Sequence, residues 1–329
     1  MKSILIPLMA SVAIAAAASG ATAAPDVVVS IKPVHSLVAA IMKGVGEPQL
    51  IVDGAASPHT YNLRPSNARK LEKADVVFWV GPGLEAFLQK PLEALASKAT
   101  VVELDDAKGL EKLPLREGGP FEAHDHREEG HETHDGHTEG EAAHDHGHDH
   151  ADADDHEHGA YDTHLWLDPA NAKAMAQTIE TALIAADAGN AATYQANTKK
   201  LIDDLDTLDA EIAETVKPVK DKPFIVFHDA YQYFEHRYGV KTAGSITVSP
   251  ETLPGADRVK QMQEKVRQLG ATCVFAEPQF EPKLVSVITE GTKAKSATLD
   301  PEAATLEPGP DLYFKLMRGI AGSLKDCLS

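Results

Sequence analysis

The stretch Asn190–Val216 reads NAATYQANTKKLIDDLDTLDAEIAETV and contains neither glycine nor proline. Its apolar side chains recur every three or four positions, at Leu201, Leu205, Leu208, Ile212 and Val216. This spacing marks one face of a helix, so the stretch predicts a single helix of about 27 residues, roughly 40 Å long. Lys217-Pro218 ends it, because a residue that precedes proline disfavours helical angles. A helix of this length in mid-chain can join two lobes as a stiff connector.

Strand and helix patterns alternate on both sides of this connecting helix. Before it, strands are expected at 26–31, 50–52, 74–80 and 100–104, and helices at 33–43, 66–73 and 85–98. After it, strands are expected at 224–227, 241–246, 272–276 and 296–299, and helices at 230–238, 256–269, 282–291 and 311–324. Such alternation is typical of βα units with a parallel sheet. We therefore expect an α/β fold of two βα lobes with mostly parallel sheets, joined by one long rigid helix, with a ligand site in the cleft between them.

A further element is expected just before the connecting helix. Asp162-Thr-His-Leu-Trp-Leu167 reads as a short strand, and a helix should open at Asp168-Pro169. Aspartate is a favoured N-cap residue, and proline suits the first helical position.

The first residues have the features of an export signal. Met1-Lys2-Ser3 precede an apolar run from Ile4 to Ala18, and Ala21-Thr-Ala23 is a small-residue cleavage site. We expect a cleavable signal peptide at 1–23 and an exported protein without stable membrane insertion. A membrane anchor is the alternative, but the run is too short to span comfortably. The expected organisation is then an N-terminal lobe at 24–189, the connecting helix at 190–217 and a C-terminal lobe at 218–329.

The net charge of −19 is concentrated in one segment. Between Glu122 and His158, fourteen acids accompany Arg127 as the one base, so the segment carries −13 and leaves −6 for the rest. This balance argues against nucleic acid as a partner. The segment has no helical or strand periodicity and few apolar residues, so we expect a disordered loop inserted in the first lobe.

Eleven of the sixteen histidines lie in this His-rich segment, interleaved with the acids. They are His124, His126, His131, His134, His137, His144, His146, His148, His150, His156 and His158. Imidazoles and carboxylates at short, irregular spacing suit borderline divalent ions, Zn²⁺ above all. A flexible chain does not preorganise its ligands, so we expect several weak zinc sites here. An acidic, solubilising linker is the alternative interpretation.

Cys273 and Cys327 are the two cysteines of the chain. In an exported protein they can form one disulfide. It would close a loop of about 54 residues and add about 4 kcal/mol of stability in the chain-entropy model. Two buried free thiols are the alternative.

Five histidines lie outside the His-rich segment, and three of them follow an expected strand, lie in it or end it. These are His59, His164 and His228, and Asp300 likewise follows the strand at 296–299. Ligands of open α/β sheets bind beyond the carboxyl ends of the strands, so the four side chains can converge between the lobes. Three imidazoles with a carboxylate or a water suit tetrahedral zinc. His35, at the start of a helix, and His236, on an exposed helix face, are expected not to be ligands.

Several motifs carry a resemblance to a known family. They are Ser57-Pro-His-Thr-Tyr-Asn-Leu-Arg-Pro-Ser66, Ala74-Asp-Val-Val-Phe-Trp-Val-Gly-Pro-Gly-Leu-Glu85, His164-Leu-Trp-Leu-Asp-Pro169, Phe227-His-Asp-Ala-Tyr231 and Phe275-Ala-Glu-Pro-Gln279. Together with the His-rich segment, they make the chain resemble the ZnuA-type periplasmic zinc-binding proteins, which are metal-binding solute-binding proteins of bacterial ABC transporters. The resemblance spans nearly the whole mature chain. It implies two lobes on a rigid helix, and delivery of zinc to an inner-membrane permease with its ATPase.

The resemblance also implies roles for individual residues. His59, His164 and His228 match the three imidazole ligands, and Asp300 matches an aspartate that ligates in some members and yields to water in others. Some zinc-binding members have an acid before the first histidine, where this chain has Pro58. Glu277 is a candidate to support a ligand, with a buried structural acid as the alternative.

Other functions stay open at this level. The same scaffold can serve manganese or iron, although three nitrogen ligands are softer than Mn²⁺ prefers. Three histidines and a water also describe the zinc of a hydrolase, and the His-rich segment alone could serve an extracellular metal buffer or a metal-dependent adhesin. We expect a monomeric receptor that is not an enzyme.

Overall fold

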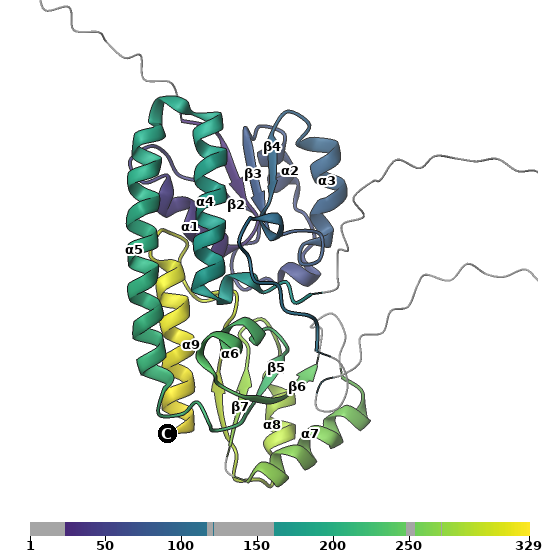
Figure 1. The fold of residues 1–329 in the computed structure, drawn as a ribbon. Helices are drawn as coiled ribbons and strands as arrows, with labels where there is room; N and C mark the ends of the chain where they lie inside the picture. Colours follow the sequence, from purple (N-terminus) through teal and green to yellow (C-terminus); the bar gives the residue numbers. More distant parts are fainter. Residues whose placement is uncertain (1–23, 117–120, 122–160, 248–253, 271) are drawn as a thin grey trace, which may run out of the picture.

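The computed structural model describes residues 24–116, 121, 161–247, 254–270 and 272–329 (Figure 1). The expected signal peptide at 1–23 and the His-rich segment lie outside the described residues. The described chain forms two lobes, one above the other in Figure 1, with long helices running along one side of both. None of the described helices is both long and apolar enough to cross a membrane.

Each lobe contains a four-stranded sheet that is parallel throughout, which confirms the expected α/β fold. The strands of the first sheet are, in spatial order, β2 (Gln49–Leu50), β1 (Val27–Val29), β3 (Val76–Trp79) and β4 (Thr100–Glu103). Those of the second are β6 (Thr242–Thr247), β5 (Phe224–His228), β7 (Cys273–Ala276) and β8 (Lys295–Thr298). In both sheets the strand order reverses between two central strands, β1 and β3 in the first sheet and β5 and β7 in the second. Such a reversal opens a crevice at the carboxyl ends, where ligands of these folds bind.

Short helices connect the strands. The first lobe has α1 (Lys32–Ile41), α2 (Pro65–Leu71) and α3 (Gln89–Leu95), and the second has α6 (Gln232–Tyr238), α7 (Ala256–Leu269) and α8 (Lys283–Thr289). The helix predicted at 85–98 is shorter, with a separate 3₁₀ turn at Ala86–Leu88 before it. Pro91 explains the break, because proline fits the first turn of a helix that starts at Gln89 but not the interior of a longer one.

The connecting helix is confirmed as α5 (Ala191–Val216), 26 residues long. It packs against α4 (Pro169–Ala186), α9 (Leu312–Leu328) and α1. All five apolar residues of its predicted stripe are buried. The side chain of Asp168 caps α4 by accepting a hydrogen bond from the Ala170 N–H at 2.7 Å, as its N-cap pattern predicts.

The predicted disulfide joins Cys273 in β7 to Cys327 in α9, with Cα atoms 6.1 Å apart. Helix α9 thus is covalently tied to the second sheet while it packs along α5 and α1 (Figure 1).

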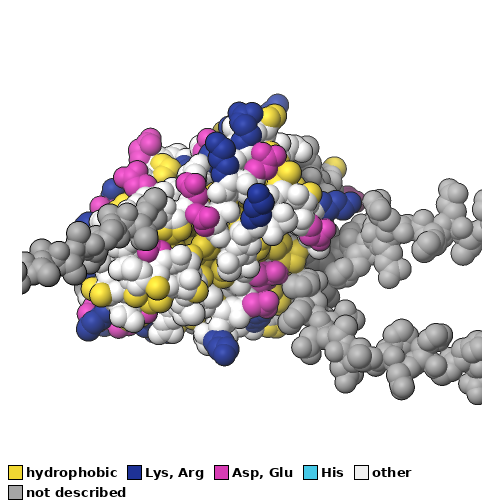
Figure 2. All heavy atoms as spheres, turned by 90° about the horizontal axis from the view of Figure 1, so that it is seen from above, with side chains coloured by type: hydrophobic (Ala, Val, Ile, Leu, Met, Phe, Trp, Pro, Cys, Tyr) yellow, Lys and Arg dark blue, Asp and Glu magenta, His cyan; other side chains and the backbone are white. Residues whose placement is uncertain are grey.

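The main cluster of buried apolar side chains runs through both lobes. It includes Val28 and Phe78 of the first sheet, Leu205 of α5, and Phe224 and Phe275 of the second sheet. A smaller cluster fills the other face of the second sheet, beneath α7 and α8. Because the larger cluster is continuous, the lobes share packing and do not meet only through α5. On the face seen in Figure 2, acidic and basic side chains are interspersed.

The strand predicted at Asp162–Leu167 is wrong. Leu165–Leu167 form a 3₁₀ helix, and the Asp162 side chain accepts a hydrogen bond from the His164 N–H at 3.0 Å, closing a tight turn. Aspartate commonly stabilises turns in this way. The apolar residues Leu165, Trp166 and Leu167 are buried by this turn instead of by strand pairing.

Candidate metal centre

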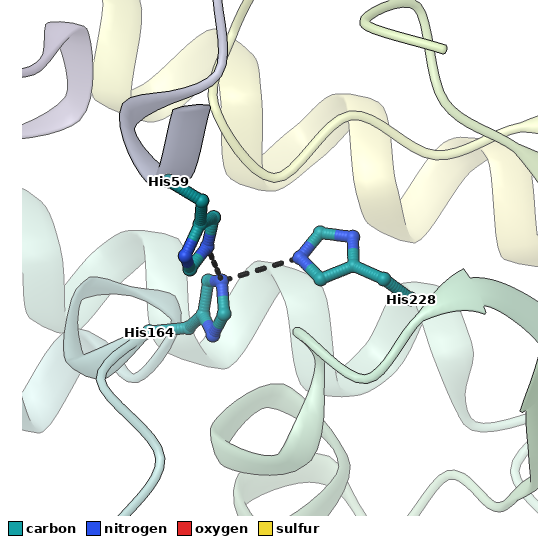
Figure 3. Close-up of side chains that lie close together, drawn as sticks. All are labelled: His59, His164 and His228. Atoms are coloured by element: carbon teal, nitrogen blue, oxygen red, sulfur yellow. Dashed lines mark hydrogen bonds between the residues drawn. The ribbon is translucent and has the colours of Figure 1, made fainter. Parts of the chain in front are cut away.

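Three imidazole rings converge between the two lobes. His59 lies in the 3₁₀ helix Pro58–Thr60 of the first lobe, His164 directly precedes the turn Leu165–Leu167, and His228 is the last residue of β5. Figure 3 shows the three rings turned toward one another. The Nε2 atom of His164 lies 3.3 Å from Nε2 of His59 and 3.3 Å from Nε2 of His228. All three possible ligand atoms lie within 4.8 Å of one another.

Two of these rings, those of His164 and His228, contact a carboxylate through Nδ1, the ring nitrogen that faces away from the centre. Nδ1 of His164 lies 2.7 Å from Oδ1 of Asp162, and Nδ1 of His228 lies 2.7 Å from Oε1 of Glu277. A carboxylate accepts hydrogen bonds, so each Nδ1 carries the proton and each Nε2 presents a lone pair to the centre. A metal ion binds an unprotonated ring nitrogen, so this tautomer leaves Nε2 free to be a ligand.

Burial and charge give the histidines different affinities for protons. Burial, together with the neighbouring His164 and His228, lowers the pKa of His59 well below its ordinary value of 6.5. Burial alone would also lower the pKa of His228, but the Glu277 carboxylate outweighs it, and the net shift is upward. His59 is therefore neutral and ready to ligate at neutral pH, whereas protons compete with a metal ion more strongly at His228 than at His59.

Aromatic side chains flank the imidazoles. The His164 ring lies 5.3 Å from the Trp166 ring, and the His228 ring lies 6.2 Å from the Phe280 ring, measured between centroids. His164 and His228 are 5% and 3% exposed, while His59 is half-buried. The centre is thus reached past His59, and its deeper part is shielded from water.

Asp300, the fourth predicted ligand, is not part of this group of three. It follows β8 and is half-buried, but its carboxylate does not belong to the cluster of ligand atoms within 4.8 Å. Its Oδ1 atom instead accepts hydrogen bonds from Nε2 of Gln279 at 3.0 Å and from the backbone N–H of Glu302 at 3.2 Å.

The remaining histidines of the sequence prediction lie away from this centre or outside the described residues. His35 is buried in α1, and its Nε2 lies 3.0 Å from the carbonyl oxygen of Pro48. His236 is exposed on α6, with Nδ1 3.6 Å from Glu111. The eleven histidines of the His-rich segment lie outside the described residues. Sequence reasoning missed Asp162, although an acid two residues before a candidate ligand was a signal that could have identified it.

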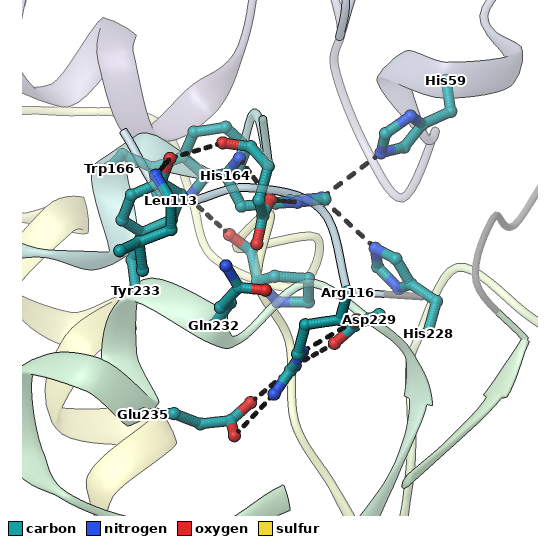
Figure 4. Close-up of polar contacts among 12 residues, drawn as sticks. His59, Leu113, Arg116, His164, Trp166, His228, Asp229, Gln232, Tyr233 and Glu235 are labelled. Atoms are coloured by element: carbon teal, nitrogen blue, oxygen red, sulfur yellow. Dashed lines mark hydrogen bonds and ion pairs between the residues drawn. The ribbon is translucent and has the colours of Figure 1, made fainter. Parts of the chain in front are cut away.

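The described residues on either side of the His-rich segment make contacts close to this centre (Figure 4). Arg116 donates to Asp229, the residue after His228, through Nε at 3.0 Å, and to Glu235 of α6 through Nη1 at 2.9 Å. On the returning side, the Asp162 N–H donates to the Leu113 carbonyl at 2.9 Å. Arg116 therefore contacts the residue after His228, and Asp162, which supports the His164 ring, is paired with Leu113.

A second group of acids, Glu103, Asp105 and Asp106, also lies close together in the described part of the chain. Oδ2 of Asp105 accepts a hydrogen bond from the Tyr161 hydroxyl at 2.6 Å. Nothing beyond this proximity points to an ion there.

Comparison with known proteins identifies the family of this chain. Residues 27–327 match the family model described as the periplasmic component A of the zinc-uptake complex. The high-affinity zinc uptake system protein ZnuA of Brucella suis is 60% identical over 305 residues, covering 92% of this chain and 91% of the relative. The ZnuA protein of Paracoccus denitrificans is 41% identical over 305 residues, covering 92% of each chain. The structure of the periplasmic zinc-binding protein TroA from Treponema pallidum superposes with a TM-score of 0.74 at 17% identity, covering 93% of this chain and 99% of TroA, which supports the fold. The chain belongs to the family of periplasmic A components of zinc-uptake complexes.

Proposed function

We propose that this protein is a periplasmic receptor that captures one Zn²⁺ ion tightly at His59, His164 and His228. The observation that carries the proposal is the 3.3 Å spacing from Nε2 of His164 to Nε2 of each other ring. In a tetrahedral site with Zn–N bonds of about 2.0–2.1 Å, two ligand nitrogens lie about 3.3–3.4 Å apart. The rings therefore need little movement to bind zinc.

Delivery to an inner-membrane ABC permease and its ATPase is the second part of the proposal. It is supported by family membership and by the zinc uptake named in the curated relatives. In this interpretation residues 1–23 direct export, the lobes 24–189 and 218–329 enclose the ion, and 190–217 connects them. The eleven histidines of the His-rich segment bind additional zinc more weakly, and the receptor acts as a monomer.

Binding fits the site better than hydrolysis. A zinc hydrolase needs a general base beside the metal-bound water. Asp162 and Glu277, the carboxylates placed against the imidazoles, both accept ring N–H groups. Manganese or iron on the same scaffold is also less favoured, because Mn²⁺ and Fe²⁺ stand at the weak end of the divalent series for nitrogen ligands.

A competition titration tests the proposal. Metal-free protein titrated with zinc against a strong chelator should show one site far tighter than the rest. His228→Ala should weaken that site by orders of magnitude, whereas the matched control His236→Ala, which changes an exposed imidazole, should leave it unchanged. Equal effects of the two substitutions would contradict the assignment.

A further inference from the structure

Residues 111–116, here called the crossing segment, join helix α4 to helix α6 beside the metal centre. At its start, the N–H and the carbonyl of Glu111 both pair with the side-chain amide of Asn171 in α4, at 2.8 and 3.0 Å. Further along, the Leu113 N–H donates to the hydroxyl of Tyr233 in α6 at 3.1 Å (Figure 4). The crossing segment therefore links α4 to the second lobe.

Arg116, the last residue of the crossing segment, binds the turn that follows His228. Its guanidinium donates through Nε to Asp229 at 3.0 Å, and through Nη1 and Nη2 to the two carboxylate oxygens of Glu235 at 2.9 Å each. Asp229 is the middle residue of a tight turn in which the Ala230 N–H donates to the His228 carbonyl at 2.9 Å. Both acidic side chains are at most 10% exposed. A planar guanidinium that meets carboxylates in this way fixes their direction as well as their distance.

Tyr233 holds the turn that carries His164. Its hydroxyl donates to the carbonyl oxygen of Asp162 at 2.6 Å, and the Asp162 carboxylate accepts both the backbone N–H and the ring N–H of His164. Tyr233 is itself buried, so its hydroxyl has a fixed position. The turn with His164 is therefore held by α6, and the turn after His228 is held by the crossing segment.

We propose that Arg116 and Tyr233 are positioning residues that hold the rings of His228 and His164 at the spacing zinc requires, and that this spacing favours Zn²⁺ over larger ions. The inference rests on the proposed zinc-binding function. Ligands that are already in place bind more tightly, because ordering them costs binding free energy. Tetrahedral zinc fits the 3.3 Å between the two Nε2 atoms. Mn²⁺ favours six ligands, mostly oxygen, and gains less from imidazoles held close together.

Arg116→Lys is the principal test, because lysine keeps the positive charge but cannot contact both carboxylates as a fork. Removing the charge would leave two acids without their cation, and their attraction for zinc would mask the loss of position. Arg116→Lys should weaken the tight site about tenfold in a chelator competition titration, as is typical of residues that support metal ligands. Arg318→Lys is the matched control, because Arg318 forms the same kind of fork with Glu211 on the exposed side of α9. It should leave zinc affinity unchanged.

Selectivity separates positioning from a general loss of structure. Binding of Mn²⁺ is followed by electron paramagnetic resonance of the free ion. Protein loaded with one equivalent of zinc serves as the blank, so the difference reports the tight site. Arg116→Lys should change Mn²⁺ affinity by less than about threefold, and the ratio of zinc to manganese affinity should therefore fall. The proposal is overturned if both metals weaken equally, or if zinc affinity falls no further than in the control.

Tyr233→Phe tests the same spacing from the side of His164. It removes a single oxygen atom, and we expect zinc affinity to fall about threefold with a lower ratio of zinc to manganese affinity. Tyr194→Phe, which removes a buried hydroxyl that donates to Asp187 at 3.0 Å, is its control and should change neither quantity. If Arg116→Lys does not fold, the same two criteria applied to Tyr233→Phe decide the proposal. Failure of the proposed function would instead appear as a wild-type protein without a tight zinc site.

Discussion

Nδ1 of His228 lies 2.7 Å from Oε1 of Glu277, and the same oxygen accepts the His228 backbone N–H at 3.3 Å. His228 ends β5 and Glu277 directly follows β7, the neighbouring strand in the sheet. The strand order therefore places His228 and Glu277, the carboxylate that accepts its ring N–H, next to each other at the crevice of the second sheet. One carboxylate fixes the orientation, the tautomer and the proton affinity of the ring.

Removing the charge of Glu277 should weaken zinc binding. In Glu277→Gln the amide oxygen can still accept the ring N–H, but the negative charge that makes the imidazole more basic is lost. Substitutions of residues that support metal ligands typically cost about 10–100-fold in affinity, and we expect a loss in this range from a chelator competition titration. The control is Glu281→Gln, an exposed acid four residues later. A change no larger than the control's would show that Glu277 only fills space.

Zinc should be lost on acidification. The pKa of His228 is raised by Glu277 and that of His59 is lowered by burial, so protons compete with the ion at His228 before they do so at His59 as the pH falls. Free histidine titrates near 6.5, so tight-site zinc should be released increasingly as pH falls through about 6 to 5. Equilibrium dialysis at a series of pH values checks this, with circular dichroism to show that the protein stays folded. Unchanged retention at pH 4 would point to a different set of ligands.

Zinc loading should move the lobes only slightly. Helix α5 lacks glycine and proline, and hinges need residues whose φ and ψ can change. In addition, the Tyr313 hydroxyl donates to the Trp166 carbonyl at 2.7 Å, and Trp166 donates to Pro301 of the other lobe. Crystal structures with and without zinc should therefore differ by local shifts of the loops around the imidazoles. A wide rotation of one lobe against the other would disprove this expectation.

Deleting Glu122–His158 should leave the tight site intact. The flanking residues are already joined by the bridge between Pro114 and Tyr161, so a short connection can replace the segment. The shortened protein should bind fewer zinc ions in total and should load more slowly, most clearly at low salt, because the segment's charge of −13 attracts cations over about 8–10 Å. Stopped-flow loading and total zinc content measure the two effects.

A second variant separates charge from ligation in the His-rich segment. Replacing its eleven histidines by glutamine keeps length and charge, so it should lose the weak sites but load as fast as the wild type. Loss of the tight site in either variant would mean that the segment supplies a primary ligand.

Glu85 should make stability depend on pH. It is fully buried at the end of the first sheet and accepts hydrogen bonds from the N–H groups of Val80 and Gly81. Burial raises its pKa to about 7, above the ordinary 4.5. The folded state then binds the proton more tightly than the unfolded state, so this contribution to stability is complete below pH 4.5 and is lost as pH rises through 7.

In Glu85→Gln this dependence should disappear. The difference in unfolding free energy between the wild type and the variant should decrease by about 3 kcal/mol from pH 4.5 to pH 8, as measured by denaturant unfolding of zinc-free protein. The exposed Glu93→Gln is the control. A difference that does not vary with pH would mean that Glu85 keeps an ordinary pKa in the folded protein.

The connecting helix and the parallel sheets could be predicted because they depend on local patterns, and the disulfide because the chain has two cysteines and an export signal. The stripe from Leu201 to Val216 and the cap at Asp168 involve residues within a few positions of each other. The positions of His59 and His228 after strands were also visible, because parallel strands place their carboxyl ends on one side of a sheet. The turn at Leu165–Leu167 was missed because a short apolar run fits a strand and a buried turn equally well.

The sequence by itself therefore determined the elements, their order and the residue types available for zinc. Only the tertiary structure decided which side chains meet. It brings together three Nε2 atoms from residues that lie 64 to 169 positions apart, and it places Asp162 and Glu277 behind two of the rings. It also turns Asp300 toward Gln279 instead of the imidazoles. The physical reason is that helix and strand formation follows from neighbouring residues, whereas a side chain's contacts depend on loop paths and on packing between lobes, which no local pattern encodes.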